Sequence, residues 1–387
     1  MARIGATEAG GVTRLALSDA DREARDLLRR WCEEDGRPVA VDDLGNVYCG
    51  RLAADAVVCG SHLDSVARGG RFDGVLGVLC GLEVLRTIEQ AGLRTRRPAA
   101  LVNFTNEEGA RFEPAMMASG VLAGTRDLEQ VYAVADREGR RFGDELERIG
   151  YRGAPGNRLA KFEAYFELHI EQGPVLESAG IPVGVVTGIQ GIQWCEVAFS
   201  GQQSHAGATP MDMRRDPLAA FARFAVAVRD LARRGPDTAA TIGRLRLIPD
   251  VINVIPGRVE LGLDLRCPER ERLDELLRGA HALARRAAAE ENLDLEFSPF
   301  WRSEPTAFDA GLVDSVERSA GALGVRTMRL ISGPGHDAKY MADLGRAAMI
   351  FVRTVRGRSH CEDEDARWED CEAGANVLLH AVLEAAG

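Results

Sequence analysis

The chain has 387 residues, of which 45% are hydrophobic and 28% are charged, a composition typical of a globular protein. Its 48 Lys and Arg residues against 59 Asp and Glu residues give a formal net charge of −11, which argues against a nucleic-acid partner. No apolar run reaches the 18 residues needed to cross a membrane. This length predicts two domains.

The eight cysteines are scattered along the chain and form no Cys-x-x-Cys pair. The first residues lack the apolar segment of a signal peptide. We therefore expect free thiols and a cytoplasmic location.

Strand-like and helical patterns alternate through both ends of the chain. The expected strands cover residues 57–60, 99–104, 165–170 and 347–352, and the expected helices cover 19–34, 74–90 and 372–386. Ser18 is the predicted N-cap of the first helix. Strands and helices that alternate at these lengths predict an α/β domain with a mostly parallel sheet.

The middle of the chain follows a different order. Its patterns predict strand, helix, strand, strand, helix and strand over residues 193–199, 217–234, 238–247, 254–266, 269–291 and 293–297. This β-α-β-β-α-β order is that of a ferredoxin-like unit. We predict it as an inserted domain at 191–302, within an α/β domain made of 1–190 and 303–387.

Several metal-ligating residue types follow the predicted strands. His62 comes directly after the first apolar run, Glu107 and Glu108 follow the second, and His169 ends the third. His360 lies in a loop beyond the fourth. Open α/β sheets place their ligand sites along the edge where the strands end, so these residues are expected to lie close together.

The combination of these residues predicts a metal site. Two His with one Asp and one Glu suit zinc, whereas three His with a shared carboxylate and a second one suit two metals. In the adjacent pair of Glu107 and Glu108, one side chain can ligate metal while the other accepts a proton from water. Any one of these residues alone is more often a packing or solvated side chain, but the combination is not easily explained that way.

The motifs resemble those of a known superfamily. His62-x-Asp64-x-Val66, Asp73 and Glu107-Glu108 together resemble the M20 dimetal peptidases. Three further segments resemble the hydantoinase/carbamoylase branch of amidases: HIEQGPVLE at 169–177, GQQSHAGATPM at 201–211 and GHDA at 335–338. The resemblance extends over nearly the whole chain.

The resemblance implies two divalent metal ions per subunit, which can be Zn, Mn or Co. His62, Asp73 and His169 are implied to hold one ion. Asp73, Glu108 and His360 are implied to hold the other, so that Asp73 bridges the two. The peptide bond between Asp73 and Gly74 is expected to be cis, as it often is in the family.

Other roles are implied by the same resemblance. Glu107 is the expected general base, and His205 the expected group that polarises the scissile carbonyl from the partner subunit of a homodimer. The insert would then act as a lid and dimerisation domain. The implied substrate-binding residues are Gln172, Asn253, Arg266, Gly333 and Gly335. A salt bridge with a nearby acid is the alternative for Arg266.

Several segments depart from the family pattern, and Arg353-Thr354 replaces its usual Pro-Ser before the loop of His360. Pro334 replaces a residue with a backbone donor in the loop that helps hold the substrate carboxylate, so substrate acceptance could shift. Residues 361–365 form an unusually acidic stretch beside His360, which we interpret as a solvated loop.

The function implied is hydrolysis of a carbamoyl or ureido C–N bond in a small anionic substrate, with release of ammonia and CO2. An N-carbamoyl-L-amino acid is the first expectation, with allantoate and ureidopropionate as alternatives. An aminopeptidase or dipeptidase of the superfamily is a second enzyme hypothesis. A metal-dependent binding module without turnover is a third, and the intact Glu107 argues against it.

Overall fold

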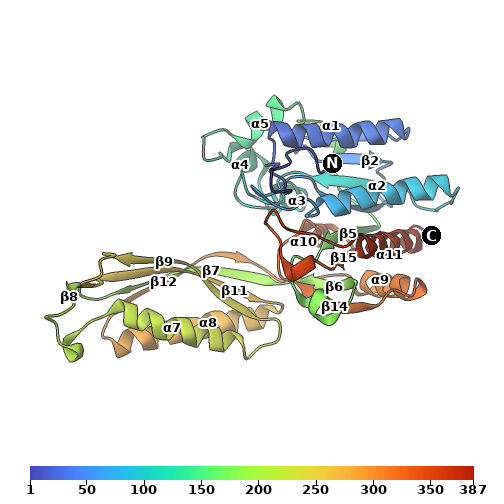
Figure 1. The fold of residues 1–387 in the computed structure, drawn as a ribbon. Coiled ribbons are helices and arrows are strands. Elements are labelled where there is room, and N and C mark those ends of the chain that lie inside the picture. The colour runs from blue at the N-terminus through green and yellow to red at the C-terminus, as the bar shows by residue number, and fades with distance from the viewer. The chain divides into compact units, whose positions relative to one another are not determined.

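The structure is a computed structural model that describes all residues from Met1 to Gly387. The chain divides into two units (Figure 1). The first unit contains Met1–Gly188 and Ala307–Gly387, and the second contains Ile189–Thr306. The insert predicted at 191–302 falls inside the second unit.

The first unit is built on a nine-stranded sheet, in which β14 (Thr327–Ser332) pairs with β6 beside the main strand path. The main path runs, in order, through β1 (Val39–Val41), β2 (Val47–Gly50), β4 (Ala99–Phe104), β3 (Val57–His62), β5 (Ala164–Ile170), β15 (Ala347–Val352), β6 (Val183–Ile189) and β13 (Thr306–Ala307). The central strands β4, β3, β5 and β15 are parallel. β2 and β6 pair antiparallel on either side of them. The predicted α/β class with a parallel sheet is confirmed.

The parallel centre is buried along its whole length. Every residue of β3, β5 and β15 is buried, as expected where helices cover both faces of a parallel sheet. The long helices of this unit are α1 (Asp19–Glu34), α2 (Val75–Gln90), α9 (Ala310–Ala322) and α11 (Trp368–Ala386), and the short helix α10 (Ala338–Leu344) precedes β15. Ser18 caps α1 as predicted, and its side chain accepts the Asp21 N–H at 3.2 Å.

Glycines allow α2 to lie close against the sheet. A Cβ at Gly77 would lie 2.3 Å from the carbonyl oxygen of Leu168 in β5, and one at Gly81 would lie 2.7 Å from Leu101 in β4. Only glycine permits this approach. The start of α2 is thereby held directly beside the ends of β3 and β5.

The segment between β4 and β5 was not resolved into elements from its sequence. It forms three short helices, α3 (Met117–Leu122), α4 (Leu128–Ala133) and α5 (Phe142–Arg148), and a 3₁₀ turn at Pro155–Asn157. The short helix α6 (Val175–Ala179) and a 3₁₀ turn at Val355–Gly357 lie in later loops.

The second unit is a four-stranded antiparallel sheet with two helices. The strand order is β12 (Asp294–Ser303), β7 (Gly191–Ser200), β11 (Arg258–Cys267) and β9 (Ala239–Ile248), and the helices are α7 (Pro217–Ala232) and α8 (Arg270–Glu290). Burial alternates strictly along β11, so one face of the sheet packs against the helices. The predicted ferredoxin-like order is confirmed.

One predicted strand of this unit is broken in two. Residues 254–266 were expected to be continuous, but β10 (Val254–Ile255) ends before Pro256, and β11 begins at Arg258. Proline has no N–H for a ladder bond, which explains the break. β10 pairs instead with β8 (Ser204–His205), with Val254 opposite His205, and a 3₁₀ turn follows at Met211–Met213.

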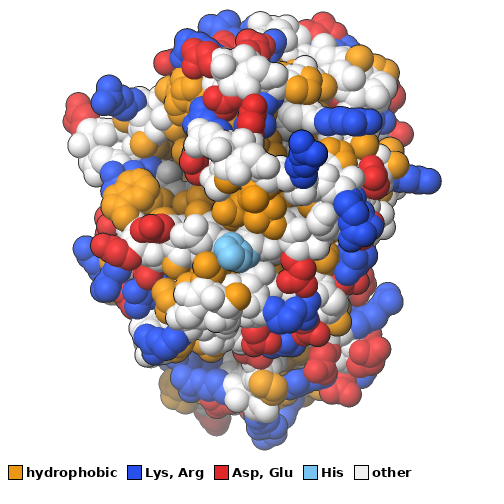
Figure 2. Space-filling view, turned by 90° about the vertical axis from the view of Figure 1, so that its right-hand side faces the viewer, with side chains coloured by type: hydrophobic (Ala, Val, Ile, Leu, Met, Phe, Trp, Pro, Cys, Tyr) orange, Lys and Arg blue, Asp and Glu red, His pale blue; other side chains and the backbone are white.

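No helix is both long and apolar enough to cross a membrane. On the side toward which the C-terminus lies, basic and acidic side chains are interspersed with small hydrophobic patches (Figure 2). The excess of acidic residues is therefore not gathered into one region of this face.

A buried carboxylate fixes the turn between β1 and β2. Asp42 is fully buried and accepts four hydrogen bonds, from the backbone N–H groups of Leu44 and Asn46 at 2.9 Å, the Asn46 amide at 2.9 Å and the Tyr48 hydroxyl at 2.8 Å. Burial raises the pKa of Asp42 to about 6, although all four donors favour the charged form.

Replacing Asp42 with alanine leaves these four buried donors without an acceptor. We expect the free energy of unfolding to fall by about 3 kcal/mol, measured by urea denaturation. Asp55, which is exposed, provides the control, because Asp55→Ala should change stability by less than about 0.5 kcal/mol. Equal stability of the two variants would contradict this account of the turn.

Candidate metal centre

The predicted site residues of the first unit come from the carboxyl ends of neighbouring strands. His62 is the last residue of β3, and His169 is the penultimate residue of β5. Glu107 and Glu108 lie in the loop after β4, and His360 lies in the loop after β15. The parallel register of these strands places their ends at the same edge of the sheet.

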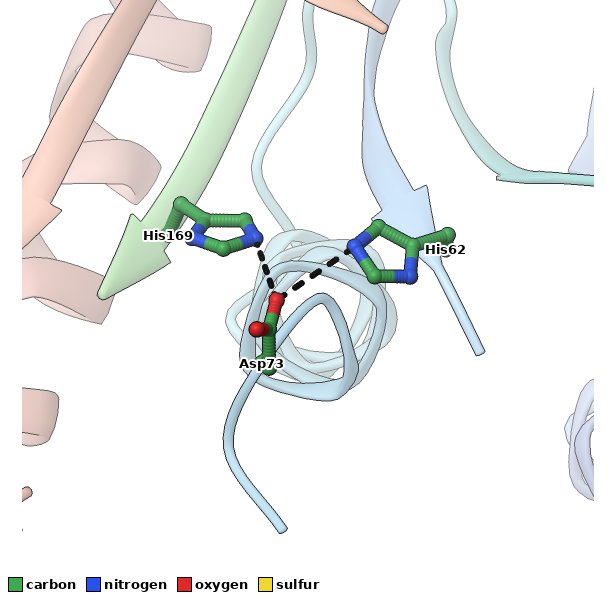
Figure 3. A group of neighbouring side chains, drawn as sticks. All are labelled: His62, Asp73 and His169. Atoms are coloured by element: carbon green, nitrogen blue, oxygen red, sulfur yellow. Dashed lines mark ion pairs between the residues drawn. The ribbon is translucent and has the colours of Figure 1, made fainter. Parts of the chain in front are cut away.

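Asp73 lies between two of the histidines (Figure 3). Its Oδ1 atom is 3.6 Å from Nε2 of His62 and 3.1 Å from Nε2 of His169. All three side chains are nearly fully buried. They form one group whose ligand atoms lie within 4.8 Å of one another.

Hydrogen bonds fix the orientation of both imidazole rings. The Nδ1 atom of His62 donates to the carbonyl oxygen of Asp64 at 2.9 Å, and that of His169 donates to the carbonyl oxygen of Ile170 at 2.9 Å. The N–H of Gly74 donates to Nε2 of His169 at 3.1 Å. The Nε2 lone pairs therefore face the Asp73 carboxylate, and acceptors that face one another in this way fit a bound divalent cation.

The turn after Asp73 differs from the one expected. The two cis peptide bonds are Glu113–Pro114 and Ile248–Pro249, so the expected cis bond between Asp73 and Gly74 is wrong. Gly74 instead takes a φ of +65°, and a Cβ there would lie 2.4 Å from the His62 ring. A glycine in the left-handed region makes this turn and leaves room for the histidine.

A second group shares the same aspartate. Nε2 of His360 is 3.4 Å from Oδ2 of Asp73 and 3.4 Å from Oε2 of Glu108. These three residues also have ligand atoms within 4.8 Å of one another. Asp73 therefore presents one carboxylate oxygen to each group, which is the arrangement that a bridging ligand requires.

The electrostatics of the centre follow from burial and opposite charges. Burial works against the charged form of Asp73, but the three histidines, which donate to it from Nε2 when they are protonated, hold the pKa of its carboxyl well below the usual value. Burial, together with the nearby Asp73 charge, raises the pKa of Glu108 to about 8. The hydrogen bond to Asp73 is the largest cause that raises the pKa of His360 to about 9.

Glu107 belongs to neither ligand group. Its Oε2 atom is 3.6 Å from Nε2 of His62, and burial is the main cause that raises the pKa of its carboxyl well above the usual value. The backbone N–H groups of Glu107 and Glu108 donate to the two oxygens of Asp64, at 3.3 and 3.2 Å. Asp64 was not predicted as a site residue, although it stands in the His62-x-Asp64 motif; the structure shows that it orients both glutamates.

Gln172 contacts the centre itself. Its Nε2 atom donates to Oδ2 of Asp73 at 2.8 Å and lies 3.3 Å from Nε2 of His360. Its Oε1 atom is buried and has no hydrogen-bond partner. An unpaired acceptor beside the metal-ligand groups is suited to a donor from a substrate, which is the role predicted for this residue.

A buried carboxylate in β5 anchors the end of the glycine-rich loop that precedes α10. Glu167 in β5 accepts hydrogen bonds from Ser61 Oγ at 2.7 Å, Tyr165 Oη at 3.0 Å and the N–H of Ala338 at 2.9 Å. His336 packs on His169, with ring centroids 4.5 Å apart. Gly335 lies against Met116, and a Cβ there would lie 2.8 Å from the terminal methyl of that side chain. Gly333 precedes it in the same loop.

Three predicted residues lie in the second unit. His205 is exposed, and its Nδ1 atom accepts the backbone N–H groups of Gly207 and Ala208 at 3.0 and 3.1 Å. The proton of the neutral ring is therefore on Nε2 and can be donated outward. Asn253 is its neighbour, because the Asn253 carbonyl accepts the N–H of Ala206 at 3.1 Å.

Arg266 forms the salt bridge that was the alternative to a substrate role. Its Nε atom donates to Oδ1 of Asp264 at 3.0 Å, and its Nη2 atom donates to Oδ2 at 3.0 Å. The indole of Trp194 also donates to Oδ2 of Asp264, at 2.9 Å. In this chain the guanidinium fork is thus matched to a carboxylate, the same chemical group that an acidic substrate offers.

Comparison with known proteins assigns the chain to a class. Residues 58–384 match the family described as Peptidase family M20/M25/M40, which is metal-dependent, so the chain belongs to this family. The histidine–carboxylate groups are candidates for its metal site. The crystal structure of a hydantoinase/carbamoylase family amidase from Burkholderia multivorans matches at 46% identity with a TM-score of 0.94, covering 100% of this chain and 95% of that one. The chain belongs to this hydantoinase/carbamoylase amidase family, whose members act on C–N bonds other than peptide bonds.

Similar proteins of known activity span the same length. The N-carbamoyl-L-amino-acid amidohydrolases of Rhizobium meliloti and Geobacillus stearothermophilus are 44% and 40% identical to this chain; the alignments cover all of it and 94% and 96% of theirs. The aminopeptidase PepT from Bacillus cereus shares the fold, with a TM-score of 0.66, but only 17% identity.

The shared position of Asp73 gives a direct prediction. Asp73→Ala removes a carboxylate oxygen from both ligand groups, so the divalent metal bound per chain should fall at least about tenfold, measured by elemental analysis after dialysis. The exposed residue Asp55 again supplies the control variant, Asp55→Ala. Metal content that is the same in both variants would show that Asp73 is not a ligand.

Proposed function

We propose that this chain is an N-carbamoyl-L-amino-acid amidohydrolase that works with two divalent ions, Zn, Mn or Co, bridged by Asp73. It would hydrolyse the carbamoyl C–N bond to give the amino acid, ammonia and CO2. The observation that carries the proposal is the position of Glu107, a buried carboxylate 3.6 Å from His62 that belongs to neither ligand group. A binding module would have no use for such a base.

The metal ions and Glu107 would have different roles in the hydrolysis. Bound divalent ions would lower the pKa of a water molecule and polarise the carbamoyl carbonyl. Glu107 takes the proton of the attacking water and then delivers it to the departing nitrogen. One carboxylate can serve both steps, because it accepts the proton in the first and returns it in the second.

We propose that His205 donates its Nε2 proton to the substrate carbonyl, where negative charge develops. The two backbone N–H groups at Nδ1 keep this proton on Nε2. We further propose that the enzyme is a homodimer in which His205 serves the partner subunit. Support comes from three strongly exposed apolar side chains around β8 and β10, Met211, Met213 and Ile252, which are 77%, 71% and 103% exposed.

Substrate binding would use the predicted polar residues. The fork of Arg266 is paired with Asp264 in the free chain, and it would pair in the same way with the substrate carboxylate. Gln172 supplies an unpaired acceptor for the carbamoyl nitrogen. Asn253 and the backbone of Gly333 and Gly335 are proposed as further donors. Pro334 between the two glycines offers none.

Other ureido compounds are the second candidate. The ureidoglycolate hydrolases of rice and Arabidopsis are 33% and 32% identical to this chain. Allantoate and ureidopropionate belong to the same chemical class. We rank these below N-carbamoyl-L-amino acids because the relatives that carry that name are more similar in sequence. The eight free cysteines support a cytoplasmic location.

The proposed function is tested by ammonia release from a panel of substrates. The metal-loaded chain should hydrolyse N-carbamoyl-L-amino acids at least about tenfold better in kcat/KM than the D-isomers, allantoate, ureidopropionate or ureidoglycolate. Glu107→Gln should lower kcat by about a hundredfold or more while the bound metal is unchanged. A panel with no ammonia release from any carbamoyl or ureido compound would contradict the proposal.

Action of His205 in trans is tested with two inactive variants. His205→Ala and Glu107→Gln are mixed under conditions that exchange subunits. A mixed dimer contains one site with both intact residues, so a random mixture should recover about a quarter of the wild-type activity. If mixed dimers form and no activity returns, His205 does not act on the partner subunit.

A further inference from the structure

The acidic stretch beside His360 is not uniformly solvated. Glu362 and Asp365 pair with arginines near the surface, Arg68 and Arg71 respectively. Glu364, in contrast, is only 3% exposed. The interpretation of 361–365 as a solvated loop is therefore wrong for this residue, because its carboxylate points into the protein and accepts hydrogen bonds there.

The groups that donate hydrogen bonds to Glu364 lie next to the proposed metal ligands. Oε1 of Glu364 accepts the backbone N–H of Asp73 at 3.1 Å and that of Phe72 at 3.3 Å. Oε2 accepts the hydroxyl of Ser359 at 2.7 Å. Ser359 directly precedes His360. One carboxylate thus joins the backbone of the shared aspartate to the residue before the histidine of the second ligand group.

The backbone near Glu364 leaves space for its carboxylate. A Cβ on Gly70 would lie 1.8 Å from Oε1 of Glu364, so only glycine leaves room for the carboxylate. His360 has a φ of +56°, a conformation that costs free energy for any residue with a side chain. His360 needs contacts of this kind to hold its backbone, because its side chain is half exposed.

We propose that Glu364 is a positioning residue that holds Asp73 and His360 in place for the ligand group that they form with Glu108. This inference rests on the proposed function, in which that group binds a metal ion. The Glu364 carboxylate makes no hydrogen bond to a ligand side chain, so it acts through the backbone N–H groups of Phe72 and Asp73 and through Ser359. The role is distinct from that of a metal ligand.

Loss of Glu364 should affect the two ligand groups unequally. His62 in β3 pairs with Phe104 of β4, and His169 in β5 pairs with Phe351 of β15, so the sheet holds both histidines independently of Glu364. His360 lies in a loop and depends on Ser359 for support. Residues that orient ligands are worth about 10–100-fold in metal affinity. We therefore expect a larger loss of affinity for the ion held by His360 than for the ion held by His62 and His169, which shares Asp73 but has two ligands fixed in strands.

Three variants separate positioning from general stability. Glu364→Ala removes the carboxylate. Glu364→Gln keeps an oxygen for the backbone N–H groups and should restore most of the binding. Gly70→Ala leaves Glu364 in place but pushes its carboxylate away. The controls are Asp365→Ala in the same loop, whose carboxylate pairs with Arg71, and Gly156→Ala, where a Cβ meets nothing within 4 Å.

The measurement is metal bound per chain during titration with a competing chelator, together with the visible spectrum of the Co²⁺-loaded chain. Wild type and both controls should hold two ions. Glu364→Ala and Gly70→Ala should lose one ion at a chelator concentration at least about tenfold lower than the concentration that wild type requires. Gly70→Ala should add little to Glu364→Ala in the double variant, because the group that it displaces is already absent.

The outcomes separate this inference from the proposed function. A wild-type chain that binds no metal would overturn both. A wild-type chain with two ions, and the same affinity in Glu364→Ala, would overturn the positioning role alone. Equal weakening of both ions, or a Glu364→Gln variant no better than Glu364→Ala, would also overturn it, since either result indicates a general structural defect.

Discussion

The structure of the centre depends on one buried carboxylate that faces three imidazoles. Asp73 offers Oδ1 to His62 and His169 and Oδ2 to His360. A buried carboxylate is costly unless it is paired, and the surrounding histidines oppose this cost and keep its pKa low when they carry a proton on Nε2. Because the Nε2 lone pairs of His62 and His169 also point at it, a divalent cation is the partner that satisfies all these acceptors at once.

The fold supplies this arrangement through the parallel centre of the large sheet. β3 and β5 end side by side, the loop after β4 supplies both glutamates, and Asp73 stands just before α2. The glycines of α2 bring that helix against β4 and β5. The surrounding polar residues then complete the site: Asp64 orients the two glutamates, and Glu364 holds the backbone of Asp73.

Much of this was predictable from the sequence, because hydrophobic periodicity depends on burial and strand ends follow from it. The central strands, the ferredoxin-like order and the nearness of His62, Glu108, His169 and His360 were expected from these patterns, and the place of Asp73 in both ligand groups was implied by the family resemblance. The partners of individual carboxylates were not. The sequence around Glu364 is uniformly acidic, and only the tertiary approach of Gly70 and Asp73 distinguishes it from its neighbours. Likewise, the left-handed conformation of Gly74 depends on the approach of the His62 ring, which a linear pattern does not contain. The salt bridge of Arg266 was one of two expected roles, and the structure shows that its partner is Asp264, two residues earlier on the same strand.

The central claim, that Asp73 bridges two metal ions, is tested most directly by anomalous diffraction from crystals of the metal-loaded protein. The account predicts two anomalous peaks per chain, one among His62, Asp73 and His169 and the other among Asp73, Glu108 and His360. A single peak, or peaks that do not share Asp73, would contradict it.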